Sequence, residues 1–472
     1  MAHLETLPRR RGPPPLQQNR ARPDEGGRST RLTLDQSRSR CLNSERTLIL
    51  GGGISGLACA LRLAGAGRKV TLVEGSDRLG GLGAFFEHEG RTFEKFYHCM
   101  LPSDGPLLAL LDSLGLTPEI YWKPSTFAYA GAGRIFPLNT PLDLLRFAPL
   151  PFADRIRVGL TGLWGRLCSD KGLDDLSTVD WLTRLSGRRA FETFWKPMLE
   201  AKFGDRHQDV PALWFWTRFN REKGESKGEV KGYIRGGYKR IIERAAERLR
   251  ELGVEIRLGE SIQSADLDEN GSPFVITARG REDAARLLIT LPWPGLAQVT
   301  GPRLRQAAQV PDWGIDFQGV VNHLLFLKRP LTPHYWLATP ESQFPFDGVV
   351  ETSALTDESD RGTGRHVVYL TKYLHRDDPR FAQPAEEIHR PWFAALQRLF
   401  PDLAESDVEA AHTFRAPYVE PVYTRGFLKR RPPEVLVPGK VFLATTAQVY
   451  PVVTSWNGSV IQAGRTVDAM LL

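Results

Sequence analysis

The sequence predicts an α/β fold that contains a parallel, nucleotide-binding β-sheet. An apolar strand at 46–50 leads into a glycine turn at 51–56, and an apolar helix follows. A second strand at 69–74 then ends on an acidic residue, Glu74. This order of strand, glycine turn, helix and strand is typical of the first unit of a Rossmann-like sheet. With 472 residues, the chain exceeds what one hydrophobic core usually sustains, so two or three structural domains are expected.

The glycine turn has the spacing of a dinucleotide site. Gly51, Gly53 and Gly56 fit G-x-G-x-x-G, in which the first glycine makes the tight turn and the second lets the backbone approach a pyrophosphate. The third glycine packs the helix against the strand. Free N–H groups and the helix dipole then favour an anion at the helix N-terminus. Glu74 follows Gly56 by 18 residues, near the spacing at which a carboxylate binds the adenosine ribose hydroxyls.

The turn after Glu74 favours a flavin over a nicotinamide. At 75–83 the chain resembles the superfamily of FAD-dependent amine oxidases, protoporphyrinogen oxidases and phytoene desaturases. Members of that superfamily carry an arginine and paired glycines along the flavin pyrophosphate, and Arg78, Gly80 and Gly81 match this pattern. The alternative for 75–83 alone is an ordinary flexible turn.

Six further segments resemble a bacterial branch of the superfamily, described as NAD(P)/FAD-dependent oxidoreductases. The likeness covers about residues 46 to 470, and the branch has no single agreed reaction. The segments are Phe93–His98, Trp195–Pro197, Lys202–Gly204, Gly232–Tyr238, Phe414–Tyr418 and Thr446–Pro451.

The resemblance implies noncovalently bound FAD and assigns its contacts. Ile262 would present backbone atoms to the adenine, and residues 457–460 would form a helix N-terminus facing the flavin ring and ribityl chain. The implied cofactor-binding residues are Gly51, Gly53, Ile54, Ser55, Gly56, Glu74, Gly75, Arg78, Gly80, Gly81, Leu82, Ile262, Asn457, Gly458, Ser459 and Val460. The chain departs from its branch at 452–456, where relatives carry an acid-arginine-glycine turn and this sequence has Val-Val-Thr-Ser-Trp. Two charges beside the expected flavin ring are thereby lost.

The FAD-binding domain is expected to be discontinuous, formed by 46–100, 232–295 and 435–472. In the second piece, an amphipathic helix ends near Gly253, and Asn270-Gly271 marks a hairpin. An inserted, mixed α+β substrate domain would take its helical part from 101–231 and its sheet-containing part from 296–434. Strand-like runs at 317–327 and 366–374 and a helical pattern near 386–400 support the latter.

Composition excludes several classes of function. Residues 1–45 hold nine arginines and five acids, which gives +4 of the net charge of +7. This Pro-, Arg-, Gln- and Ser-rich stretch is interpreted as a disordered basic tail, and the balanced remainder predicts no nucleic-acid partner. The four cysteines are scattered without a C-x-x-C pair, so neither a disulfide framework nor a metal site is indicated.

A cytoplasmic location is expected, because the cysteine pattern fits a reduced chain and no run of 18 apolar residues is present. The stretch 142–152 leaves peripheral contact with a membrane interface open. An internal cap helix is the favoured interpretation of that stretch, because Pro149 and Pro151 interrupt the amphipathic pattern.

The resemblance implies an FAD-dependent oxidoreductase, a dehydrogenase, desaturase or oxidase that removes a hydride from a C–C or C–N bond of an apolar or amine small molecule. The sequence names no general base. Candidates for contact with the substrate are Tyr97, His98, Arg415 and Tyr418. The alternative for His98 is a histidine satisfied inside the core, and the alternative for Arg415 is a structural ion pair. Two alternatives stay open: a non-redox sugar mutase resembling UDP-galactopyranose mutase, and a flavin-binding protein without catalysis.

Overall fold

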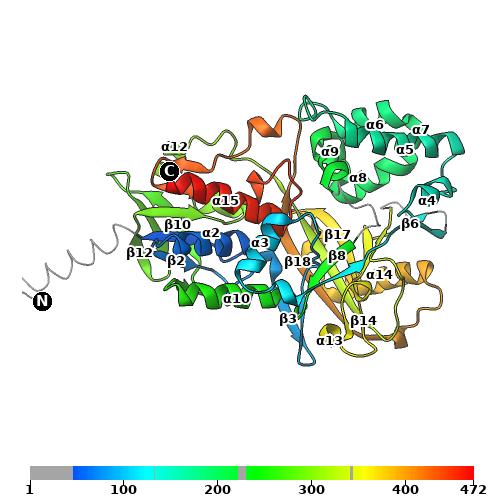
Figure 1. The fold of residues 1–472 in the computed structure, drawn as a ribbon, viewed down its shortest axis with the longest axis horizontal. Helices are drawn as coiled ribbons and strands as arrows, with labels where there is room; N and C mark the ends of the chain where they lie inside the picture. The colour runs from blue at the N-terminus through cyan, green and yellow to red at the C-terminus, as the bar shows by residue number, and fades with distance from the viewer. Residues whose placement is uncertain (1–45, 132, 222–229, 341–343) are drawn as a thin grey trace, which may run out of the picture. The chain divides into compact units, whose positions relative to one another are not determined.

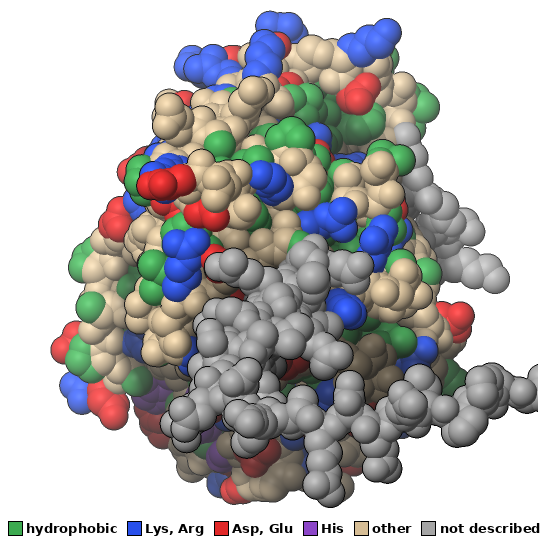
Figure 2. All heavy atoms as spheres, turned by 90° about the vertical axis from the view of Figure 1, so that its left-hand side faces the viewer, with side chains coloured by type: hydrophobic (Ala, Val, Ile, Leu, Met, Phe, Trp, Pro, Cys, Tyr) green, Lys and Arg blue, Asp and Glu red, His purple; other side chains and the backbone are tan. Residues whose placement is uncertain are grey.

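A six-stranded and a seven-stranded β-sheet, each with its own helices, form the framework of the protein (Figure 1). The structure is a computed structural model that describes residues 46–131, 133–221, 230–340 and 344–472. The predicted tail at 1–45 lies outside the described residues. On the face that Figure 2 shows, Lys and Arg side chains lie beside Asp and Glu side chains, and hydrophobic side chains form small groups.

The six-stranded sheet combines strands from three separate stretches of the chain. All neighbours pair in parallel except β19, which is antiparallel to β20 at the edge. In sheet order the strands are β19 (Val435–Val437), β20 (Val441–Leu443), β13 (Arg286–Ile289), β1 (Thr47–Leu50), β2 (Val70–Val73) and β9 (Glu255–Arg257). The predicted discontinuous Rossmann-like fold is confirmed, while the proposed domain boundaries stay a prediction.

Both faces of this sheet are covered, which explains why its strands are apolar throughout. Successive residues of a strand point to opposite faces. Ile49 accordingly belongs to the core formed with the helices α2 (Ile54–Gly65), α10 (Gly237–Glu251) and α15 (Trp456–Leu471). Leu48 and Leu50 belong to the core on the other side, which includes the three-stranded sheet. That sheet consists of β10 (Ile262–Leu267), β11 (Pro273–Thr277) and β12 (Gly280–Asp283), with α11 (Trp293–Val299) and α12 (Pro302–Ala307) nearby.

Helices α2 and α15 pack side by side and run in the same direction (Figure 1). The Cys59 thiol donates to the Ala463 carbonyl, and one turn further along both helices Arg62 pairs with Asp468 at 2.7 Å. The N-termini of the two helices therefore lie at the same end of the sheet, where β1, β13 and β20 finish.

The seven-stranded sheet is mostly antiparallel, with one parallel pair between β15 and β6. In order its strands are β18 (Val408–Pro421), β14 (Phe317–Leu327), β17 (His366–His375), β16 (Gly348–Glu351), β15 (Trp336–Ala338), β6 (Phe127–Gly131) and β7 (Arg134–Pro137). Helix α14 (Ala385–Leu399) packs on one face, where Trp392 and Phe393 join Val321 and Leu325 in a common core. The opposite face carries Tyr369, whose hydroxyl donates to the Glu94 carbonyl.

The stretch 101–231 is not helical throughout. Residues 120–137 form β5 (Ile120–Pro124), β6 and β7, because their aromatic and branched residues suit a strand and pair with partners far along the chain. Strand β5 pairs with β8 (Val230–Ile234). The helices of the stretch are α3 (Gly105–Ser113), α4 (Pro141–Leu145), α5 (Phe152–Leu167), α6 (Thr178–Ser186), α7 (Arg188–Ala190), a π-helical turn at Phe191–Trp195, α8 (Lys196–Phe203) and α9 (Ala212–Arg221).

The stretch 142–152 contains only the short helix α4 and the turn that precedes α5. Thr140 and Asp143 form a capping box at the start of α4. Phe147 and Leu150 are fully buried, so the middle of this stretch is anchored in the core, whereas Leu142 is 52% exposed. No helix among the described residues is long and apolar enough to cross a membrane.

Candidate functional site

The glycine turn between β1 and α2 excludes side chains at two of its positions. Gly51 has φ of +108°, and a Cβ there would lie 2.6 Å from Thr290 Oγ1. A Cβ on Gly56 would lie 2.0 Å from the Gly51 carbonyl oxygen. The first and third glycines are thus required for the turn itself and for the approach of helix to strand, as the spacing predicted.

The N-terminus of α2 is open to a ligand. Its N-cap, Gly53, offers no side-chain acceptor, and the first turn contains no acidic residue. The first N–H groups of a helix have no partner within the helix and attract anions. Gly53, Ile54 and Ser55 are only half-buried, and a Cβ on Gly53 would find only Gly81 Cα within 4 Å, at 3.8 Å. The backbone around Gly53 is therefore accessible to a phosphate group.

A second glycine turn lies beside the first. Gly53 and Gly80 form a parallel β-bridge, and the Gly80 N–H donates to the Gly52 carbonyl at 2.9 Å. Gly80 and Gly81 both have positive φ, +128° and +55°, which L-residues with a side chain rarely adopt. Leu82 is half-buried at this turn. Arg78 is half-exposed and pairs with Asp77 at 3.3 Å, so its guanidinium stays accessible.

We call the two neighbouring glycine turns, at 51–56 and 80–81, the glycine cradle. Glu74 and the start of β10 form the far end of this cradle. The Glu74 carboxylate accepts hydrogen bonds from the Gly52 N–H at 2.6 Å and the Ser76 N–H at 2.9 Å. The Glu260 N–H donates to the Glu74 carbonyl, and a Cβ on Gly75 would lie 3.2 Å from Ser261 Oγ. Ile262, half-buried at the start of β10, therefore follows directly on a segment that contacts the turn after Glu74.

The N-terminus of α15 is capped from within. The Ser455 side chain accepts from the Gly458 N–H at 3.1 Å, and Asn457 Oδ1 accepts from the Leu107 N–H of α3 at 3.0 Å. The Oδ1 atom of Asn457 is thus engaged by α3. Ser459 is buried and Val460 half-buried. Together with α2, this places two positive helix ends at one edge of the sheet.

A polar cluster lies on the face of the seven-stranded sheet that carries Tyr369. The Tyr97 and Tyr373 hydroxyls are hydrogen-bonded at 2.8 Å, and Lys202 Nζ lies 3.6 Å from the centre of the Tyr373 ring. Lys202 Nζ also pairs with Glu420 Oε2 at 2.7 Å, and Arg218 lies 3.9 Å from the same carboxylate. We call Tyr97, Tyr373, Lys202, Glu420 and Arg218 the Lys202 cluster.

Both members of the Lys202–Glu420 pair are charged at neutral pH. Burial opposes the charge on Lys202, but Glu420 and Tyr373 outweigh it, so the pKa of Lys202 is raised. Burial likewise opposes the charge on Glu420, but Lys202 and then Arg218 outweigh it, so the pKa of Glu420 is lowered. Burial, with Tyr373 second, raises the pKa of Tyr97 well above its usual value. Tyr97 can therefore donate a hydrogen bond and does not act as a base.

Three more polar side chains on this face are fully buried. Asn322 is paired with Thr371 across β14 and β17, and Gln318 lies on the same face of β14. Gln318 Nε2, Asn322 Oδ1 and Thr371 Oγ1 have no hydrogen-bond partner within the described part of the chain. Buried polar atoms are usually paired with protein, water or ligand. A polar occupant of this region would satisfy them.

His98 lies in an aromatic environment beside α15. Its ring is 4.8 Å from Tyr238 and 5.7 Å from Trp456, measured between ring centres. Burial lowers the pKa of His98 to about 4, so the imidazole is neutral at physiological pH. Trp456 itself packs against Gly83, where a Cβ would lie 2.4 Å from the indole. His98 is thus a neutral, packed side chain. It follows Tyr97 of the Lys202 cluster in the sequence and contacts Trp456, which packs on the second glycine turn.

Arg415 and Tyr418 do not join the Lys202 cluster. Arg415 is paired with Val321, one position out of step with Val320 and Tyr373, so it points to the α14 face of the sheet. There its guanidinium donates to the Gln383 carbonyl, a structural contact that is not the ion pair left open by the sequence. Tyr418 is half-buried and packs edge-on against Phe317, with 6.4 Å between ring centres.

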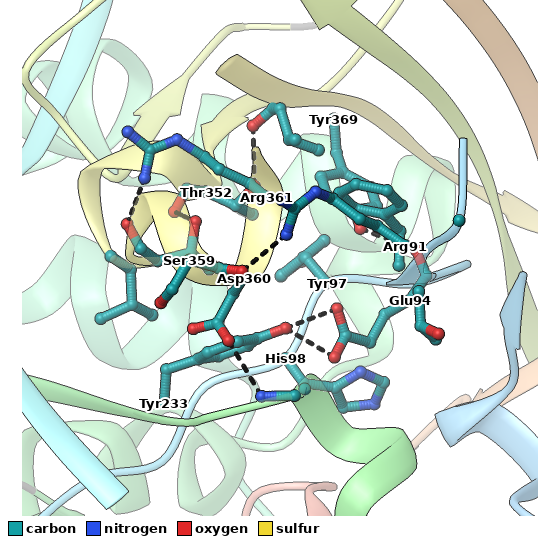
Figure 3. Close-up of a pocket in the computed structure, with 18 residues that line it drawn as sticks. Arg91, Glu94, Tyr97, His98, Tyr233, Thr352, Ser359, Asp360, Arg361 and Tyr369 are labelled. Carbon is teal, nitrogen blue, oxygen red and sulfur yellow. Dashed lines mark hydrogen bonds between the residues drawn. The ribbon is translucent and has the colours of Figure 1, made fainter. Parts of the chain in front are cut away.

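A cavity of about 230 Å³ adjoins Tyr97 and His98 (Figure 3). Its wall includes Glu94, whose carboxylate accepts from the Tyr233 hydroxyl at 2.6 Å and the Tyr238 N–H at 2.8 Å. Burial raises the pKa of Glu94, although Tyr233 partly opposes this. Asp360, at the end of α13 (Glu358–Arg361), accepts from the Gly236 N–H at 2.9 Å. The carboxylates of this cavity are therefore held by the protein itself.

Sequence reasoning missed Lys202, Tyr373, Glu420 and Glu94 as site residues. Lys202 and Glu94 belong to segments that carry the family resemblance, and this was the available signal. Tyr373 and Glu420 lie in long strands and carry no local motif. Among the described residues, no group of three His, Cys, Asp or Glu is placed to hold a metal.

The parallel sheet, the paired glycine turns and the inserted substrate domain define a dinucleotide-binding flavoprotein fold. The chain belongs to the family of flavin containing amine oxidoreductases, whose sequence profile matches residues 54–471. Membership confirms the predicted superfamily, the flavin and the oxidoreductase class.

Individual relatives are distant. Mitochondrial protoporphyrinogen oxidase of Nicotiana tabacum is 26% identical over 184 residues, which cover 36% of this chain and 36% of that protein. The 15-cis-phytoene desaturase of Arabidopsis thaliana is 23% identical over 340 residues, which cover 61% of this chain and 58% of that protein. The chain thus spans between a third and three fifths of these relatives. Reduced UDP-galactopyranose mutase superposes with a TM-score of 0.71 at 17% identity, covering 90% of this chain and 95% of the mutase.

Proposed function

We propose that the protein binds FAD noncovalently and removes a hydride from a C–C or C–N bond of a small molecule. The observation that carries this proposal is the glycine cradle between two helix N-termini at one edge of the parallel sheet. When bound, FAD supplies the two-electron acceptor, and the protein supplies binding, orientation and exclusion of water.

The cradle assigns a role to each part of the cofactor site. The N–H groups at Gly53, Ile54 and Ser55 would bind the pyrophosphate, and Glu74 would bind the ribose hydroxyls by exchanging its internal hydrogen bonds for ligand ones. Ile262 would contact the adenine. The backbone at 457–460 would face the flavin ring, where a positive helix end favours electron density.

The Lys202 cluster supports a substrate with a polar or charged group, rather than a wholly apolar one. A buried ion pair and three unpartnered polar atoms would be costly next to a hydrocarbon. Tyr97 and Tyr373 offer hydroxyl groups that hold a substrate atom by hydrogen bonds. Because Tyr97 stays protonated and the pKa of His98 is only about 4, neither side chain is a good proton acceptor, and a proton released by the substrate would pass to solvent.

The fold alone does not separate redox from non-redox flavoenzymes, since the mutase shares it. The test begins with the absorbance of the purified, desalted protein before and after denaturation. Flavin bands that move into the supernatant on denaturation are expected, and a protein that stays colourless with added FAD would refute the proposal. Anaerobic bleaching of the flavin by amines or by carboxylated and polyene substrates would then identify the reaction. Turnover only after reduction with dithionite would instead indicate a mutase. If no candidate substrate bleaches the flavin, the protein would be a flavin-binding protein without catalysis.

A further inference from the structure

Helix α5 exposes a continuous apolar stripe. Six of the twelve large hydrophobic side chains that are exposed within the described residues lie on this one helix. They are Phe152 (65% exposed), Ile156 (41%), Leu160 (58%), Leu163 (55%), Trp164 (54%) and Leu167 (73%). Single exposed hydrophobic residues are ordinary on a protein surface, but a contiguous patch marks an interaction site.

The stripe follows helical geometry. At about 100° per residue, the six side chains fall within an arc of about 120° on the helix surface. The opposite side of α5 is buried: Val158, Thr161 and Gly165 face the neighbouring helices α6 and α9 (Figure 1). A Cβ on Gly165 would lie 2.4 Å from the Phe219 ring, so α9 is tightly packed there. The exposed stripe therefore belongs to a helix that is fixed in place by its other face.

Basic side chains border the stripe on both sides. Viewed around the helix axis, Arg157 lies next to one edge of the arc and Arg166 next to the other, each within about 40° of the nearest apolar residue of the stripe. The only acid of α5, Asp154, is buried and pairs with Arg157 and with Arg189 of α7. The side chains of Arg157 and Arg189 are 57% and 64% exposed, so the border carries net positive charge toward solvent.

We propose that α5 is a membrane-docking helix that lies in the interface of a bilayer containing anionic lipids. An apolar face flanked by arginines, with a tryptophan at its edge, matches the acyl chains, phosphate groups and interface of such a bilayer. The 16 residues of α5 span about 24 Å, less than the hydrocarbon core, and the face opposite the stripe is packed against the protein. The helix therefore lies on the membrane and does not cross it. Leu142, 52% exposed, lies on α4, the short helix that packs on α5.

The face shown in Figure 2 has a different character, because acidic and basic side chains are mixed there and its hydrophobic groups are small.

Charge complementarity favours an anionic lipid surface as the occupant of the α5 stripe over a second copy of the chain, since a second copy would place its own arginines next to those that border the stripe. The proposal is independent of the reaction proposed above, and its test requires neither FAD nor turnover.

The test is cosedimentation of the full-length protein with vesicles of phosphatidylcholine, alone or mixed with phosphatidylglycerol. Leu160→Gln/Leu163→Gln/Leu167→Gln is expected to lower the partition coefficient about a hundredfold, because three exposed leucines no longer enter the interface. Leu258→Gln/Leu428→Gln removes two leucines that are 39% and 44% exposed elsewhere and is the matched control, expected to bind like the wild type. All proteins keep the basic residues 1–45, so attraction of that stretch to anionic lipid is the same in each.

Arg166→Glu is expected to weaken binding to mixed vesicles about tenfold at low salt and to leave binding to phosphatidylcholine nearly unchanged. Equal binding by the triple leucine variant and the wild type would overturn the proposal, as would failure of the wild type to sediment with either vesicle. A wild type that dimerises without lipid, and a triple variant that is monomeric, would also overturn it in favour of a second copy on this face. Circular dichroism and thermal unfolding check that the variants are folded, which is expected because all substituted side chains are exposed.

Discussion

The approach of α2 to the glycine turn makes Gly56→Ala a direct test of the cofactor cradle. A Cβ on Gly56 would lie 2.0 Å from the Gly51 carbonyl oxygen and 3.2 Å from Thr290 Oγ1. Such an atom is not tolerated within 3.0 Å, so the helix and the turn must separate by at least 1.0 Å, the difference between 3.0 and 2.0 Å. The movement would displace the N–H groups at the start of α2, which we propose bind the pyrophosphate.

The cost of such overpacking is about 1–3 kcal/mol. If it falls on the bound state, the dissociation constant for FAD rises roughly 5- to 150-fold, since about 1.4 kcal/mol corresponds to a factor of ten. The assay is titration of the apoprotein with FAD, followed by quenching of flavin fluorescence, with thermal unfolding of the apoprotein measured in parallel.

Gly65→Ala supplies the matched control on the same helix. A Cβ on Gly65 meets nothing within 4 Å, so this alanine is expected to leave FAD affinity unchanged and to stabilise the helix by about 0.5–1 kcal/mol. The reasoning is refuted if Gly56→Ala binds FAD as tightly as the wild type, or if Gly65→Ala loses as much affinity as Gly56→Ala.

Three further substitutions test the ribose contact and the buried charges. Glu74→Gln is expected to weaken FAD binding about tenfold in the same titration, because a charged acceptor is lost, while Glu269→Gln, on an 85% exposed side chain, leaves affinity unchanged. Lys202→Met leaves Glu420 buried without its main partner and is expected to lower the free energy of unfolding, measured in urea, by about 3 kcal/mol. The double variant Lys202→Met/Glu420→Gln should restore most of this loss. Equal losses in the single and the double variant would contradict the pairing. Burial raises the pKa of Glu351 from 4.5 to about 7, so its contribution to stability is full below the unfolded value and is lost as the pH rises through the folded one. Glu351→Gln should therefore remove about 3 kcal/mol of the stability change between acidic and mildly alkaline pH, and an unchanged pH profile of urea unfolding would refute this assignment.

Local patterns predicted the cofactor side well, because its elements are short-range units. Strand, glycine turn, helix and strand follow one another within 46–74, and the Asn270-Gly271 hairpin lies where its turn residues indicated. Helix α10 ends at Glu251, two residues before Gly253, whose φ is +77°. In each case the residues that fix the backbone conformation are neighbours in the sequence.

The substrate side could not be predicted in the same way, because its contacts join distant segments. Residues 120–137 become strands through pairing with β8, β15 and one another, and no local period signals this. The Lys202–Glu420 pair joins a helix of one insertion to a strand of the other. Arg415 belongs to a recognisable segment, yet the register with Val321 turns it away from the cluster. A shift of one residue along a strand reverses the face of every side chain, and sequence alone does not fix that register.

The Lys202 cluster also bears on the charges that the 452–456 loop lacks. Thr454 of this loop is hydrogen-bonded to the Tyr423 hydroxyl at 2.9 Å, and Tyr423 follows Glu420 by three residues in the same buried segment. Residues 452–456 carry no charged side chain, whereas α8, α9 and β18 supply Lys202, Arg218 and Glu420 on this side of the site. Lys202 and Glu420 form a buried ion pair that Arg218 approaches, and charges interact more strongly in such a region than in water. Such a pair is consistent with the polar substrate group proposed above. With no charge in the loop itself, we expect the polarity of the substrate side to be set by α8, α9 and β18, and substitutions there to change substrate preference more than substitutions in 452–456.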